Sequence, residues 1–137
     1  MLSHLPNTIG KIKSLKSLEL SENQLSDLNF PNSDLELLER FDASDNLLGE
    51  FPEFLGQLET LEYVNLEGNT NIVALPSRFL SLEKALKYID LKNTPITSVP
   101  QDWLPVVNKQ CQVRYGHATS PVYMHDPTLC MNTGVST

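Results

Sequence analysis

The stretch Leu61-Glu-Tyr-Val64-Asn-Leu66-Glu-Gly-Asn69 places three apolar residues and an asparagine at spacings of three, two and three residues. The same spacing recurs in one register at three other places in the chain. These copies read Leu15-Lys-Ser-Leu18-Glu-Leu20-Ser-Glu-Asn23, Leu38-Glu-Arg-Phe41-Asp-Ala43-Ser-Asp-Asn46 and Leu86-Lys-Tyr-Ile89-Asp-Leu91-Lys-Asn-Thr94. The leading leucines are 23, 23 and 25 residues apart. The chain therefore contains an internal repeat, and a period of this length decides the fold class.

A second half follows the motif, in which most copies carry an apolar residue and then a proline. These steps are Leu5-Pro6, Phe51-Pro52, Leu75-Pro76 and Val99-Pro100, whereas the first full repeat has Leu28-Asn29 instead. Proline fixes φ and lacks a backbone donor, which suits an extended or 3-10 segment. We predict a short strand with inward apolar residues in the first half of each repeat and an irregular or 3-10 return in the second. No unit buries its apolar side chains alone, so neighbouring units must stack.

The repeat resembles the leucine-rich-repeat family, whose pattern is L-x-x-L-x-L-x-x-N-x-L, over about residues 2–105. The resemblance implies an α/β solenoid with short parallel strands on its concave face, irregular or 3-10 convex segments and a C-terminal cap. At 137 residues the chain has the length of a single domain. We expect one domain over 1–137, with a partial repeat in 1–14, four repeats in 15–105, and a cap and tail in 106–137.

The ninth position of the motif is expected to be structural. Asn23, Asn46 and Asn69 should turn inward and hydrogen-bond the backbone of the adjacent turn, so that they form a ladder. Thr94 replaces the fourth asparagine, which weakens the ladder near its end. Ala43 stands in a leucine position, and there either packing is reduced or Phe41 fills the space.

The sequence also predicts what lies at each end of the repeat array. Leu2 already occupies the closing position of a repeat, so we expect the chain to be part of a longer repeat protein, with a shortened isoform as the alternative. After residue 105 the period stops, and one or two irregular strands are expected around Cys111-Gln-Val113-Arg-Tyr115. Residues 131–137 read as a polar tail.

The C-terminal region, through Asn93–Trp103 and Val122–Cys130, resembles the ends of repeat arrays in surface proteins of oomycetes and related organisms. This resemblance implies an extracellular or cell-surface location. The alternative is a cytoplasmic scaffold or regulatory subunit, which fits the acidic charge and the lack of Asn-x-Ser/Thr sites. Cys111 and Cys130 could form a disulfide in the first setting and would be free thiols in the second.

Composition and motifs exclude several functions. The formal net charge of −7 argues against binding a nucleic-acid backbone, and no run of about 20 apolar residues could span a membrane. The cysteines are 19 residues apart and lack the tight pair typical of zinc sites. We predict no metal, no cofactor and no enzymatic activity. The remote alternative is an enzyme that uses a C-terminal cluster of His117, His125, Asp126 and the two cysteines.

Binding is expected at the outward positions of the strands. The position before the second apolar residue holds Ser17, Arg40, Tyr63 and Tyr88, and the next outward position holds Glu19, Asp42, Asn65 and Asp90. The predicted binding residues are Glu19, Arg40, Asp42, Tyr63, Asn65, Glu67, Tyr88 and Asp90. An almost wholly acidic column beside two tyrosines favours a protein or peptide partner of basic or mixed charge. The alternative is an ordinary solvated face. Calcium binding is disfavoured because no clustered oxygen-ligand loop is visible.

Overall fold

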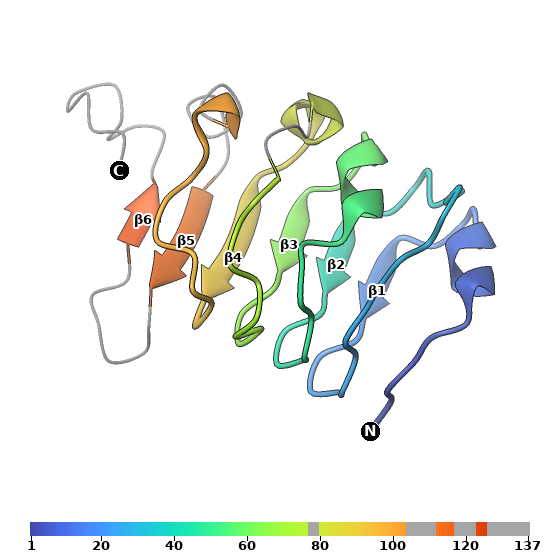
Figure 1. The fold of residues 1–137 in the computed structure, drawn as a ribbon. Helices are drawn as coiled ribbons and strands as arrows, with labels where there is room; N and C mark the ends of the chain where they lie inside the picture. The colour runs from blue at the N-terminus through green and yellow to red at the C-terminus, as the bar shows by residue number, and fades with distance from the viewer. Residues whose placement is uncertain (77–79, 104–111, 117–122, 126–137) are drawn as a thin grey trace.

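The computed structural model describes residues 1–76, 80–103, 112–116 and 123–125, and its strands form one sheet (Figure 1). The sheet order is β1 (Ser17–Glu19), β2 (Arg40–Asp42), β3 (Tyr63–Asn65), β4 (Tyr88–Lys92), β5 (Gln112–Gly116) and β6 (Tyr123–His125). β1 to β5 are parallel, and β6 is antiparallel to β5. Strands adjacent in the chain are also adjacent in the sheet. After each of the first four strands the chain therefore returns and lays the next one beside it.

The sheet contains one more parallel strand than the sequence analysis predicted. β5 pairs with β4 so that Val113 lies opposite Ile89 and Tyr115 lies opposite Leu91. The side chains of Val113 and Tyr115 are both buried, at 0% and 4% exposure. Their spacing of 24 residues from the β4 partners continues the repeat. The apolar strand positions thus persist beyond residue 105, where the second half of the motif is no longer recognisable.

The return segments explain the proline steps. They contain 3-10 helices, named η1 (Asn7–Lys11), η2 (Glu53–Gln57), η3 (Leu80–Lys84) and η4 (Gln101–Trp103). Pro6 and Pro52 directly precede η1 and η2 with φ of −67° and −64°. The return from β1 to β2, which has Leu28-Asn29 in place of apolar-Pro, contains only turns and bends. Among the described residues there is no α-helix. The parallel sheet with short 3-10 returns is compatible with a leucine-rich-repeat-like solenoid.

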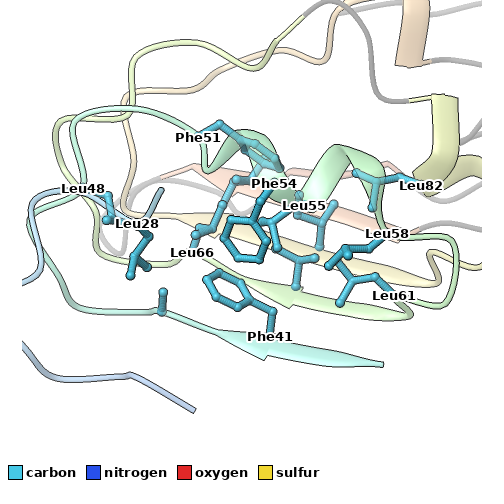
Figure 2. Close-up of a cluster of buried hydrophobic side chains, with 14 of the residues drawn as sticks. Leu28, Phe41, Leu48, Phe51, Phe54, Leu55, Leu58, Leu61, Leu66 and Leu82 are labelled. Atoms are coloured by element: carbon cyan, nitrogen blue, oxygen red, sulfur yellow. The ribbon is translucent and has the colours of Figure 1, made fainter. Parts of the chain in front are cut away.

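The core lies between the sheet and the return segments, and Figure 2 shows its central part. Phe41 from β2 is fully buried and meets the ring of Phe54 from η2 edge-on at 5.6 Å between centroids. Phe54 also meets Phe30 at 4.9 Å. Ala43, two residues after Phe41 on the same side of the strand, is fully buried in the same core. The arrangement fits the expectation that the bulk of Phe41 compensates for alanine in a leucine position.

The asparagine side chains link neighbouring repeats. The Asn46 amide donates to the carbonyl of Ala43 in its own turn, at 3.1 Å, and to that of Leu20 in the preceding repeat, at 2.9 Å. Its Oδ1 accepts the backbone N–H of Leu25 at 3.0 Å. Equivalent bonds join Asn69 to Ala43, Leu66 and Leu48, and Asn23 to Leu20 and Leu2.

Thr94 takes the ladder position of the fourth repeat with a shorter side chain. Its hydroxyl donates to the carbonyl of Leu91 at 2.6 Å and accepts the N–H of Ile96 at 3.4 Å. Both partners belong to its own turn. Within the described part of the chain, no hydrogen bond joins the Thr94 side chain to the preceding repeat, so the side-chain ladder between repeats ends at Asn69.

Candidate functional site

The strand register places the predicted residues on one side of the sheet. The middle residues of the strands, such as Phe41 and Val64, point into the core. Because side chains alternate along a strand, the residues on either side of them point to the opposite side, which we call the outer face. The first column is Ser17, Arg40, Tyr63 and Tyr88, and the second is Glu19, Asp42, Asn65, Asp90 and Arg114.

Three side chains of the first column stack on one another, and we call Arg40, Tyr63 and Tyr88 the stacked row. The tyrosine rings are 5.1 Å apart between centroids and inclined by only 6°. The guanidinium carbon of Arg40 lies 3.9 Å from the centroid of the Tyr63 ring, which is a cation–π contact. Identical positions on parallel strands lie about 4.8 Å apart, so the sheet itself sets the stacking distance.

The β1 end of the stacked row is held by an ion pair. The Nε of Arg40 lies 3.0 Å from Oε1 of Glu19, and the Ser17 hydroxyl donates to the same oxygen at 3.0 Å. The side chains of Arg40 and Glu19 are 46% and 55% exposed. Exposed pairs of this kind contribute about 0–1 kcal/mol to stability. The pair therefore serves mainly to orient the guanidinium over Tyr63.

The β5 end of the stacked row is held by a three-residue network. Arg114 donates through Nη1 to the Tyr88 hydroxyl at 2.8 Å and to Oδ2 of Asp90 at 3.2 Å. The Tyr88 hydroxyl donates to the same Asp90 oxygen at 2.9 Å. Burial, together with the adjacent Asp90, raises the pKa of Tyr88, although Arg114 opposes the rise. The bond to Tyr88 raises the pKa of Arg114. Tyr88 thus stays a neutral donor at physiological pH.

Arg114 was missed by the sequence analysis, because the search for outward positions stopped where the recognisable repeat stopped. The signal that could have found it is its spacing of 24 residues from Asp90, combined with the alternation Val113-Arg-Tyr115. This spacing matches the one between the apolar residues of β4 and β5. An apolar-polar-apolar triplet at the repeat distance was therefore sufficient to indicate one more strand.

The second column is not the open acidic surface that the sequence analysis expected. Asp42 is only 9% exposed. Its Oδ1 accepts the backbone N–H and the hydroxyl of Ser44 at 3.0 and 2.7 Å, and its Oδ2 accepts the Asn65 amide at 3.2 Å. Asp90 is 4% exposed, and besides Tyr88 and Arg114 it binds the N–H of Lys92 at 3.0 Å. Asn65 lies between the two aspartates in the register, so their carboxylates are not on neighbouring strands.

Glu67 also has partners within the chain. Its Oε1 lies 3.1 Å from Nζ of Lys92 and accepts the Asn93 amide at 3.2 Å. The side chains of Glu67 and Lys92 are only 28% and 20% exposed. Each carboxylate predicted to bind a partner is thus already bound to donors of this chain.

The structure brings the eight predicted binding residues together on or beside the outer face, and their role in binding stays a prediction. Cys111, Cys130, His117 and Asp126 lie outside the described residues, and only the backbone of His125 is described. Among the residues that are described, no group of three or more histidine, cysteine or acidic side chains could hold a metal ion. In that same part of the chain, no helix is long and apolar enough to cross a bilayer.

The chain matches no model of a known protein family. It is 35% identical over 105 residues to the disease resistance protein RPS4 of Arabidopsis thaliana, covering 74% of this chain and 8% of that protein. It is 31% identical over 119 residues to receptor-like protein 18 of the same plant, covering 73% and 14%. A probable serine/threonine-protein kinase of Dictyostelium discoideum, pats1, is 29% identical over 107 residues. The chain thus spans a small part of each relative. Its similarity to disease resistance and receptor-like proteins, taken with the repeat, loosely supports a relationship to leucine-rich-repeat proteins.

Proposed function

We propose that this chain is a non-catalytic leucine-rich-repeat solenoid module that binds a protein or peptide on the outer face of β1 to β5, the concave face of such a solenoid. The observation that carries the proposal is the stacked row, in which Arg40, Tyr63 and Tyr88 are held in one line across three strands. The relatives, among them a receptor-like protein and a disease resistance protein, fit a recognition role.

The stacked row suits binding because its side chains are already ordered. Tyrosine offers a large contact area with a polar tip and few rotatable bonds. Here Tyr88 is fixed by Asp90 and Arg114, and Tyr63 lies between Tyr88 and Arg40. Ordering a flexible side chain on binding costs about 0.5–1.5 kcal/mol. The prior arrangement of the row removes much of that cost.

The geometry argues against the basic partner that the acidic column suggested. A cation of a partner would have to displace an internal donor from Asp42 or Asp90, which are only 9% and 4% exposed. Removing a donor from a buried carboxylate leaves an uncompensated charge, which is unfavourable. The proposal therefore assigns the binding contact to the stacked row rather than to the carboxylates.

The test is an affinity capture from the source cell or its host, compared between variants of the full chain. Wild type is run beside Tyr63→Ala/Tyr88→Ala and beside a control, Leu37→Ala/Val73→Ala, which removes apolar side chains that are 48% and 72% exposed outside the stacked row. All variants are first shown to be equally folded by circular dichroism. We expect proteins that are retained by wild type and control and lost by the tyrosine variant. Equal retention by all three would place binding elsewhere on the chain, against the proposal.

We propose a cell-surface or secreted setting for the module, supported by the C-terminal likeness to surface proteins and by the receptor-like relative. A cytoplasmic scaffold is the competing setting. Thiol titration of the protein from its natural source, under denaturing and non-reducing conditions, separates the two through Cys111 and Cys130. Absence of free thiols supports the surface setting, and two free thiols support the cytoplasmic one.

A further inference from the structure

We propose that the partner presents a carboxylate, from an acidic residue of an extended peptide, to the free end of the Arg40 guanidinium beside Tyr63. This inference rests on the proposed function and specifies the chemistry of the partner. It reverses the charge that the sequence alone suggested for the ligand. It follows from which polar groups of the outer face are already bound and which are not.

Arg40 has unused donors in a fixed position. Its Nε is bound by Glu19 at 3.0 Å, and its guanidinium carbon lies 3.9 Å from the centroid of the Tyr63 ring. Among the described residues, neither terminal nitrogen of Arg40 has a hydrogen-bond partner. The side chain is 46% exposed, so these nitrogens can be reached from solvent. Two parallel N–H groups at the end of a guanidinium match the two oxygens of a carboxylate.

The acceptors around Arg40 do not compete for this position. Glu19 is engaged through its Oε1 by both Arg40 and Ser17. Asp42, next to Arg40 on β2, is bound to Ser44 and Asn65. An acceptor from a partner would therefore complete the hydrogen bonding of Arg40 without breaking an internal bond.

Tyr63 can supply a further donor at the same place. In the described part of the chain its hydroxyl has no hydrogen-bond partner, in contrast to the hydroxyl of Tyr88. The ring lies between Arg40 and Tyr88, so its position is set before a ligand arrives. A peptide whose carboxylate binds Arg40, and whose backbone lies near the Tyr63 hydroxyl, would pair with the donors of the stacked row that have no partner within the described part of the chain.

The overall charge of the chain opposes this contact at long range, so the local geometry must provide the affinity. With a formal net charge of −7, long-range attraction favours cations and opposes anions. An acidic ligand is therefore bound only where the local geometry outweighs the general repulsion.

The experiment selects binders from a random peptide display library on the folded full chain. Three forms are compared, namely wild type, Arg40→Gln and the control Lys87→Gln. Lys87 is also an exposed cation paired with a glutamate, at 64% exposure and 2.9 Å from Glu62, so its loss changes the net charge equally. We expect enrichment of aspartate and glutamate with wild type and control, and loss of that enrichment with Arg40→Gln.

A peptide selected on wild type is then measured against further variants. Affinity should fall at least about tenfold in Arg40→Gln, because a charge-assisted bidentate contact is lost. Arg40→Lys keeps the charge but lacks the fork, and it should also bind more weakly than wild type. Glu19→Gln removes the neighbouring negative charge but keeps an amide oxygen that can accept the Arg40 Nε–H, so it should bind the acidic peptide more tightly than wild type.

The outcomes separate this inference from the proposed function. Selection of basic or neutral peptides whose binding is lost in Tyr63→Ala/Tyr88→Ala would overturn the acidic partner and leave the binding face in place. Acidic peptides that bind Arg40→Gln as well as wild type would also overturn it. If no peptide is enriched on any form, both the acidic partner and peptide binding on this face are wrong.

Discussion

In the turn that follows each of the first four strands, one residue adopts the left-handed backbone conformation. The angle φ is 57° at Glu22, 51° at Asp45, 77° at Gly68 and 55° at Asn93. These residues share one position of the repeat but no common side chain. Glycine tolerates this conformation fully, asparagine and aspartate adopt it more readily than other residues, and glutamate is strained in it. The sequence pattern could not reveal the position because the backbone of neighbouring repeats, through bonds such as Gly68 N–H to Lys92 O at 3.0 Å, imposes it.

Gly68→Ala is expected to destabilise the fold. At φ 77° a side chain is strained, and an added Cβ would lie 2.1 Å from Oδ1 of Asp45. The carboxylate can move away, so the backbone strain dominates, and the free energy of unfolding should fall by about 1 kcal/mol. Urea denaturation measures the change. The control is Gly49→Ala, where an added Cβ meets no atom within 4 Å. Equal effects of the two substitutions would contradict the role assigned to the turn.

The asparagine ladder gives a second prediction at this scale. Asn46→Ala leaves the buried N–H of Leu25 without its acceptor and removes one of the two amides that donate to the Leu20 carbonyl, so the free energy of unfolding should fall by roughly 2 kcal/mol. Thr94→Ala removes bonds within one turn only and should cost about 1 kcal/mol. Chemical denaturation of both variants tests the order. A larger loss for Thr94→Ala would show that the bonds between repeats are not the important ones.

At the scale of elements, β5 shows what the sequence could and could not predict. Four strands and their order followed from the spacing of apolar residues, and the apolar-Pro steps indicated 3-10 returns. The fifth strand was not recognised as parallel, because its repeat lacks the leading leucine and the asparagine. In the structure the inward residues Val113 and Tyr115 are sufficient to hold it against β4.

The junction of β4 and β5 should respond to alkaline pH. Burial raises the pKa of Tyr88 above its ordinary value of 10.0, so the folded chain keeps the phenol proton longer than the unfolded chain does. The stabilisation is complete below pH 10 and is lost as the pH rises through the raised pKa. Stability measured by urea denaturation should therefore fall less steeply above pH 10 in Tyr88→Phe than in wild type. The same slope in both proteins would mean that Tyr88 is not protected by the fold.

The outer face illustrates the limit of sequence reasoning between elements. Its columns followed from strand alternation alone, so the residues that line the face were predictable. The pairing of Asp42 with Ser44 and Asn65, and that of Asp90 with Tyr88 and Arg114, was not. Charge in a column says nothing about which internal donors the fold brings to it. The charge of the partner is the point on which sequence and structure lead to different proposals.

For the whole molecule, each repeat buries its apolar residues against the next, so stability should be shared along the chain. Trp103 is the single tryptophan. It is 2% exposed, and it donates through Nε1 to the carbonyl of Pro76 at 2.6 Å. Its fluorescence therefore reports on the packing of the later repeats while a substitution is made in the middle of the sheet.

Leu66→Ala in the central repeat should lower the free energy of unfolding by about 2–5 kcal/mol, because Leu66 is fully buried. Trp103 fluorescence and far-ultraviolet circular dichroism should lose their signals at the same, lower urea concentration. Val73→Ala, at a side chain that is 72% exposed, is the control and should change neither. Leu66→Asp, which buries an unpaired charge, should leave the chain unfolded. A tryptophan transition that stays at the wild-type midpoint in Leu66→Ala would show that the repeats unfold independently.

The spacing of side chains along the stacked row differs from the spacing of side chains along an extended peptide. The two tyrosine rings of the row lie 5.1 Å apart, whereas an extended peptide repeats its side chains on one side every ~6.8 Å. A strand-like ligand lying across β1 to β5 therefore falls out of step with the row after a single match. Lengthening the array would add surface without adding further matches of the same kind, so selectivity rests on one well-placed contact.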